Sequence, residues 1–128
     1  MADPIEVVTA FCNEVGKGKD AMVAAFRTYF RDDTVWENVG LATTTGVEEA
    51  LGLLAGFEAQ AGAAHFDVEM LSIAQDGKRV LTERLDRMLT ASGDVVLRLR
   101  LMGIFEVDGD KITAWRDYFD TSAMNPQA

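Results

Sequence analysis

Arg84, Asp86 and Asp117 are the residues of this chain whose types and spacing most strongly suggest chemistry. Arg84 and Asp86 stand two positions apart in RVLTERLDRML, and Asp117 follows in ITAWRDYFD. Side chains alternate between the two faces of a strand, so Arg84 and Asp86 are expected on one face, among apolar neighbours. Buried charges are costly unless they pair, and an acid–arginine–acid set at an apolar face is typical of acid–base chemistry.

The charge count of this set favours separate acid and base roles. With both aspartates ionised the three residues carry one net negative charge, and burial then favours the uptake of one proton. The planar guanidinium of Arg84 has enough donors to hold both carboxylates. The coupled set would then contain one carboxylic acid and one carboxylate, as general acid–base catalysis requires. The alternative interpretation is a buried ion-pair network that only fixes the strand register.

Two residues of an earlier strand are candidates to complete the site. A strand over residues 34–39 places Trp36 and Asn38 on one face. Asn38 offers an acceptor and donors, whereas the indole of Trp36 offers one donor. Together with Asp117 they could hold a water molecule by its protons and a lone pair. Each residue also has a simpler interpretation, which is core packing for Trp36 and a polar position beside a turn for Asn38.

The elements that must position these residues are helices followed by a strand meander. Asp3, Pro4 and Glu6 form a capping box and first turn, and Thr45 with Gly46 resembles a second capped helix start. Asp76-Gly77 is a strong hairpin signal, and residues 31–33 indicate a solvated turn. The patterns predict helices at residues 4–15, from near 20 to 29, and from 47 onward with fraying around Gly62. They predict strands at 34–39, 65–74, 78–90, 95–107 and 111–119, and a short tail with one helical turn.

This order of elements predicts an α+β fold with helices over one face of a curved sheet. The outward-facing residues Leu81, Leu85 and Leu89 are too hydrophobic for a fully solvated sheet face. A partner subunit would cover them, so a homodimer is expected. The alternative is that the chain's own termini cover this face.

Length and composition indicate a single soluble domain spanning residues 1–128. The net charge of -9 argues against nucleic acid or an anionic membrane as a partner. Cys12 is the only cysteine, and neither a signal peptide nor a long apolar run is evident, so a cytoplasmic location is expected. The spacing of His and Cys predicts no metal site, and no cofactor motif is found.

The chain resembles the limonene-1,2-epoxide hydrolase family of the nuclear transport factor 2-like (SnoaL-like) group. The resemblance rests on the R-x-D pair Arg84 and Asp86, on the segment GIFEVDGDKITAWRDYFD and on the spacing between them. It implies a cone formed by a strongly curved, mostly antiparallel sheet, with the N-terminal helices packed over its concave face. It also implies a cofactor-independent epoxide hydrolase that forms a vicinal diol in a single displacement.

Roles follow from the resemblance residue by residue. Asp117 resembles the base that deprotonates the attacking water, Asp86 the acid that protonates the epoxide oxygen, and Arg84 the bridge that orients both. Asn38 matches the asparagine that helps to hold the water. Trp36 departs from the family pattern, which places tyrosine there, so an indole that only donates replaces a phenol that donates and accepts.

The substrate is predicted to be small and mostly apolar. The candidate pocket residues, most of which are equally typical of plain core, are Met70, Met88, Leu101, Gly103, Phe105, Trp115, Phe119, Leu53 and Phe57. Two alternatives stay open: an isomerase or polyketide cyclase that uses Asp117 as base without added water, and a noncatalytic ligand-binding module. The only tyrosines are Tyr29 and Tyr118, which gives ketosteroid-isomerase-like chemistry little support.

Overall fold

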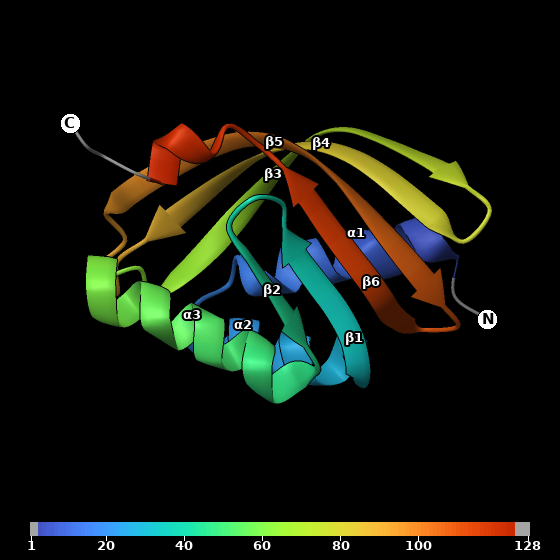
Figure 1. Cartoon of the computed structure of the whole chain (residues 1–128), viewed down its shortest axis with the longest axis horizontal. Coiled ribbons are helices and arrows are strands. Elements are labelled where there is room, and N and C mark those ends of the chain that lie inside the picture. The colour runs from blue at the N-terminus through green and yellow to red at the C-terminus, as the bar shows by residue number, and fades with distance from the viewer. Residues whose placement is uncertain (1–2, 125–128) are drawn as a thin grey trace.

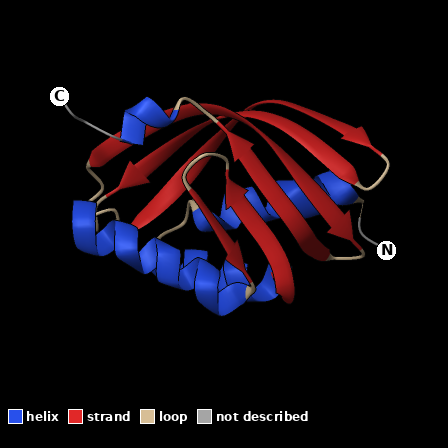
Figure 2. Cartoon of the chain, in the orientation of Figure 1, coloured by secondary structure: helices blue, strands red, loops and turns tan. Residues whose placement is uncertain are grey.

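Helices lie on one face of a curved six-stranded sheet in the computed structural model, which describes residues 3–124 (Figures 1 and 2). This confirms the predicted α+β fold. The helices are α1 (Pro4–Val15), α2 (Lys19–Tyr29) and α3 (Val47–Ala61). The strands are β1 (Phe30–Asn38), β2 (Ala42–Thr45), β3 (His65–Asp76), β4 (Arg79–Leu89), β5 (Val95–Asp108) and β6 (Lys111–Tyr118), followed by the one-turn 3-10 helix η1 (Thr121–Met124). Residues 125–128 of the predicted tail lie outside the described residues.

The strand order is β2-β1-β6-β5-β4-β3. Strands β3 to β6 form the predicted antiparallel meander, and β1 pairs with β6 in parallel. In this parallel register Trp36 lies opposite Trp115, and Asn38 lies opposite Asp117. The N-terminal strand therefore places its two candidate residues beside the last strand of the meander.

The start of α1 follows the sequence signals directly. The carboxylate of Asp3 accepts a hydrogen bond from the backbone N–H of Ile5 at 3.1 Å, and Asp3 N–H donates to Glu6 at 3.2 Å. Gly16 is the C-cap residue, as predicted. This capped helix is amphipathic and buries its apolar stripe against the sheet.

Two local predictions are wrong. Residues 31–33 belong to β1 and are not a turn, because the buried hydroxyl of Thr34 accepts from Arg31 N–H and donates to the carbonyl oxygen of Ile112. Their exposed polar side chains gave the pattern of a turn.

The N-cap of α3 is Gly46, without a side-chain cap, and Thr45 is instead the last residue of β2. Strand β2 was not predicted; it is a four-residue edge strand.

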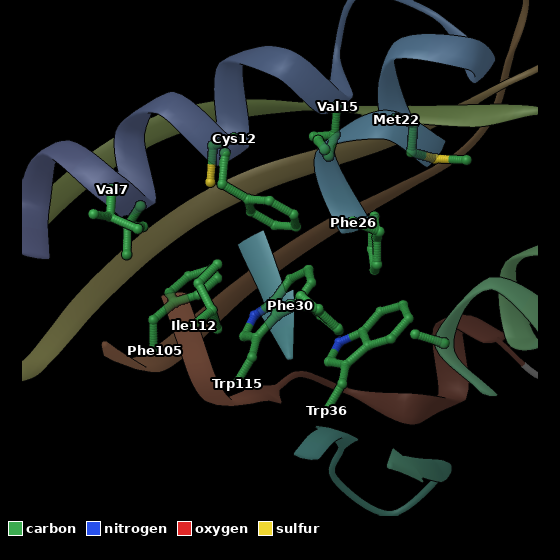
Figure 3. Packing of buried hydrophobic residues seen from close by; sticks show 14 of the residues in the cluster. Val7, Cys12, Val15, Met22, Phe26, Phe30, Trp36, Phe105, Ile112 and Trp115 are labelled. Carbon is green, nitrogen blue, oxygen red and sulfur yellow. The ribbon is translucent and has the colours of Figure 1, made fainter. Parts of the chain in front are cut away.

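Stacked aromatic rings form the part of the core that lies against the sheet (Figure 3). Trp115 lies between Trp36 and Phe105, with ring centroids 4.9 Å from each and interplanar angles of 13° and 18°. Phe11 of α1 and Phe26 of α2 pack on these rings from the helical layer.

Among the described residues no helix is both long and apolar enough to cross a membrane.

Gly46 links β2 to α3 in a backbone conformation that only glycine adopts readily, with φ 85° and ψ 171°. A Cβ there would lie 2.6 Å from the carbonyl oxygen of Asp32. Gly46→Ala is therefore expected to lower the free energy of unfolding by about 1–3 kcal/mol, measured by urea denaturation. Gly52→Ala is the matched control, because Gly52 is helical with open space around it and should gain about 0.5–1 kcal/mol. Equal effects at both positions would contradict this account.

Candidate active site

Arg84 lies at the centre of the candidate site, fully buried on the concave face of β4. Its Nε and Nη2 donate to the two carboxylate oxygens of Asp86, at 3.1 and 2.8 Å. Its Nη1 and Nη2 donate to the two oxygens of Asp117, at 2.9 and 2.8 Å. Nη1 also donates to the hydroxyl of Thr82 at 3.2 Å. All five guanidinium N–H groups are thereby used.

Burial and charge act in opposite directions on this set. Burial raises the pKa of Asp86 above its ordinary value, and Arg84 opposes that rise without cancelling it. Burial disfavours the charged form of Arg84, but Asp117 and Asp86 outweigh it and raise the pKa of the guanidinium well above its ordinary value. Arg84 therefore stays charged, and Asp86 is the carboxyl group in which protonation is favoured.

The two oxygens of Asp117 have different numbers of hydrogen bonds. Oδ1 accepts from Arg84 and also from the indole Nε1 of Trp115, at 2.7 Å. Oδ2 accepts only one bond, from Nη2 of Arg84, among the described residues. A carboxylate oxygen has two lone pairs, so Oδ2 keeps one for a further donor. Oδ2 is consequently the atom of Asp117 that is free to take a proton.

Gly103 makes room for this arrangement on the neighbouring strand β5. A Cβ at this position would lie 2.1 Å from Oδ1 of Asp117 and 2.6 Å from Nη1 of Arg84. The carbonyl oxygen of Gly103 accepts from the hydroxyl of Thr82, which orients that hydroxyl toward Arg84. Only glycine at this position allows the ion pair to form as observed.

A cavity of about 40 Å³ opens above the acid–arginine–acid set. Its lining contains Asp86, Asp117, Trp36 and Asn38 together with apolar side chains. The Nε1 of Trp36 and the Nδ2 of Asn38 are buried and have no hydrogen-bond partner among the described residues. Buried polar groups are normally paired, so these two N–H groups indicate a place for a bound polar atom.

The structure brings together part of the predicted substrate pocket. The predicted residues that line the cavity are Met88, Leu101, Trp115, Phe119 and Phe57. Four others lie outside this lining: Met70 packs against the core, Gly103 makes room for the ion pair, Phe105 stacks on Trp115, and Leu53 lines a neighbouring cavity.

Sequence reasoning missed four residues of the lining, which are Leu41, Leu54, Phe66 and Leu99. Leu99 alternates with Leu101 on β5, so strand periodicity could have indicated it. Leu54 belongs to the apolar stripe of α3, which gave a weaker signal. Leu41 lies in the turn between β1 and β2, where no local pattern identifies it.

Other reactive groups give little support to different chemistry. The described residues contain no group of three or more His, Cys, Asp or Glu side chains that could hold a metal ion. Cys12 is buried, and this burial is the main reason that its pKa is raised to about 12. The thiol therefore stays protonated. His65 stands at the start of β3, outside the cavity lining.

Comparisons with known proteins agree with this site. Residues 2–128 match the family model described as limonene-1,2-epoxide hydrolase catalytic domain. Epoxide hydrolase EphG of Mycobacterium tuberculosis is 40% identical over 93 residues, which are 73% of this chain and 59% of that protein. The match therefore spans less than two thirds of the curated relative's length.

Two solved structures show the same fold. The structure of a Mycobacterium tuberculosis LEH-like epoxide hydrolase has a TM-score of 0.71 and 35% identity, and the match covers 94% of this chain and 85% of that one. A putative SnoaL-like polyketide cyclase from Jannaschia sp. CCS1 has a TM-score of 0.73 but 16% identity, covering 94% and 88%. At that identity the likeness shows the fold alone.

Removing the central cation should destabilise the protein in a pH-dependent way. Arg84→Met leaves two buried acids without their partner, so the free energy of unfolding should fall by about 3–5 kcal/mol near neutral pH. Loss of Arg84 raises the pKa of Asp86 further in the folded state. A raised folded-state pKa gives stability that is present at low pH and lost as pH rises through that pKa, so the deficit should shrink on acidification. Urea denaturation over a pH series measures both effects.

The matched control is Arg98→Met, which removes an exposed arginine of β5. Its stability should stay within about 0.5 kcal/mol of the parent chain at every pH. A pH-independent deficit in Arg84→Met would contradict the assignment of Arg84 as the counterion of buried acids.

Proposed function

The chain belongs to the limonene-1,2-epoxide hydrolase family, and on this basis we propose that it adds water to a mostly apolar epoxide to give a vicinal diol. The observation that carries the proposal is the pair of buried aspartates held by one guanidinium below an apolar cavity. Such a pair supplies a general acid and a general base within one small space.

Asp117 is the proposed base. Asp117 lines the same cavity as Asn38, which lies opposite it in the β1–β6 register, and its Oδ2 accepts only one hydrogen bond among the described residues. A water molecule can donate one proton to Oδ2 and the other to the amide oxygen of Asn38. As Asp117 takes its proton, the water attacks one epoxide carbon from the face opposite the breaking C–O bond, so that carbon is inverted.

Asp86 is the proposed acid. Burial raises its pKa, which favours the protonated form that can donate to the epoxide oxygen as the ring opens. The proton given by Asp86 and the proton taken by Asp117 balance, so the net reaction is the addition of one water. A proton must then return from Asp117 to Asp86 before the next turnover. Arg84 contacts both carboxylates and orients them in each state.

Trp36 is proposed to position the water in place of the family's tyrosine. Its indole N–H can donate to one water lone pair and leave the second lone pair for attack. The ring is fixed by stacking on Trp115, so the direction of this N–H is set by the core. An indole cannot accept a proton, and Trp36 therefore takes no part in proton transfer.

The alternative functions fit the site less well. A noncatalytic binding module gives no reason for Asp86 and Asp117 to converge on one arginine. An isomerase with a tyrosine oxyanion hole would need a phenol in the cavity, but Tyr118 is an exposed residue of the outer face and Tyr29 packs against the core. Neither tyrosine is in the cavity lining.

The reaction is tested by incubating the protein with apolar epoxides in isotopically labelled water. Each diol should contain one solvent oxygen. Asp117→Asn and Asp86→Asn should each reduce kcat by roughly 10²–10⁴-fold or more, because each removes a proton-transfer group. Asp110→Asn is the control, since Asp110 is an exposed aspartate of the turn between β5 and β6 and lies outside the cavity lining. Full activity of Asp117→Asn would refute the mechanism.

A homodimer through the outer face of the sheet is also proposed. On this face Leu81 lies opposite Ile104, and Met102 lies opposite Tyr118. These four residues are called the outer apolar patch. Met102 and Tyr118 are 60% and 47% exposed. Charged Glu83 lies opposite Met102 and charged Arg116 lies opposite Ile104, so the apolar residues have a polar border, as interface patches commonly do. Leu85 and Leu89, which were also expected to need cover on this face, are half-buried within the chain itself.

Met102→Glu should convert the dimer into a monomer, because it places a charge in the centre of the outer apolar patch. Sedimentation equilibrium gives the mass of each species. Thr43→Glu, an exposed substitution on the edge strand β2, should leave the dimer intact. A monomeric parent chain, or an unchanged dimer in Met102→Glu, would contradict this interface.

A further inference from the structure

We propose that the epoxide is the terminal group of an elongated apolar molecule, whose body lies in a second cavity between the β1–β2 turn and α3. The proposal rests on the proposed function and names its substrate class. Two neighbouring cavities, by their sizes and by the side chains that line both, support it.

The inner cavity is too small for a whole apolar substrate. Its volume of about 40 Å³ is enough for roughly three water molecules. The attacking water and an oxirane ring fill such a space. The remaining carbon atoms of an apolar epoxide must therefore lie elsewhere, since the floor is closed by Asp86, Asp117 and the stacked ring of Trp115.

A larger cavity of about 320 Å³ adjoins the inner one. This volume is within the range of about 300–1,000 Å³ that is typical of ligand sites. Leu41 and Phe57 line both cavities, so the two cavities meet at these side chains. The full lining of this outer cavity is Leu41, Ala42, Leu53, Phe57, Gln60 and Ala61.

The lining specifies the chemistry of the occupant. Five of the six residues of the outer cavity are apolar, and none carries a charge. Leu41 is 45% exposed at the β1–β2 turn, and an apolar chain in the outer cavity would cover it. Figure 1 shows this turn and the C-terminal half of α3 on the same side of the sheet. A hydrocarbon chain or ring system fits this surface, whereas a charged group would lose hydration without a partner.

A third cavity, between α2 and α3, fits the body of such a substrate less well. Its volume is about 110 Å³, and Leu54 is the one residue that lines both this cavity and the inner cavity. Lys19 and Glu58, which form an ion pair, belong to its lining. An apolar chain would desolvate these charges, so the outer cavity beside Leu41 is the favoured location.

The test fills the outer cavity without touching the catalytic residues. Ala61 is exposed at the end of α3 and lines the outer cavity, whereas Ala59 is exposed two residues earlier and lines neither cavity. Ala61→Trp and Ala59→Trp are therefore a matched pair. The substrates are the terminal epoxides of decene and butene, which share the reacting group and differ in chain length.

The parent chain should prefer the decene epoxide, with most of the preference in KM. Ala61→Trp should lower kcat/KM for this substrate by about tenfold or more, because the displaced methylenes lose their apolar contacts. The butene epoxide should be hydrolysed equally well by both variants and the parent. Ala59→Trp should match the parent for both substrates. Equal losses for both epoxides in Ala61→Trp, or no chain-length preference in the parent, would overturn the proposal.

Binding of the decene-derived diol separates this inference from the proposed function. Titration calorimetry should detect binding of the diol to the parent chain and to Ala59→Trp with the same affinity. Ala61→Trp should bind the diol about tenfold more weakly. If no epoxide is hydrolysed but this binding pattern holds, the reaction is wrong and the outer cavity stands. If epoxides are hydrolysed and Ala61→Trp binds the diol as the parent does, the outer cavity is not the site of the substrate body.

Discussion

The buried guanidinium of Arg84 is the group on which the rest of the site depends. Three charged side chains lie out of water on an apolar face, and this arrangement is stable only because every N–H of Arg84 has an acceptor. Desolvation then favours one proton on the set, and burial raises the pKa of Asp86. The same bonds that allow the charges to be buried thus hold two carboxyl groups on one cation, the arrangement on which the proposed acid and base roles rest.

The parallel pairing of β1 with β6 connects this set to the rest of the cavity. It places Asn38 opposite Asp117 and stacks Trp36 on Trp115, whose indole N–H donates to Asp117. The aromatic core and the polar site consequently share residues. Trp36 stacks on the core ring of Trp115 and also lines the cavity.

The helical layer determines the shape of what can enter. The β1–β2 turn supplies Leu41 and α3 supplies Phe57, which line both cavities, while the strands supply the buried charged residues. In the proposed reaction the small inner cavity holds the reacting ring, and the larger apolar cavity holds the body of the substrate. Site residues on rigid strands and specificity residues on a helix and a turn can then vary independently.

The sequence by itself determined the features that depend on local patterns. The capping box of α1, the hairpin at Gly77 and the shared face of Arg84 and Asp86 follow from helix and strand periodicity, and the motif around Asp117 indicated the family. Tertiary structure alone decided the rest. The parallel partner of β1, the room that Gly103 leaves for the ion pair, and the contribution of Leu41 to two cavities depend on contacts between distant segments. Such contacts arise from three-dimensional packing, which side-chain alternation along one segment does not specify.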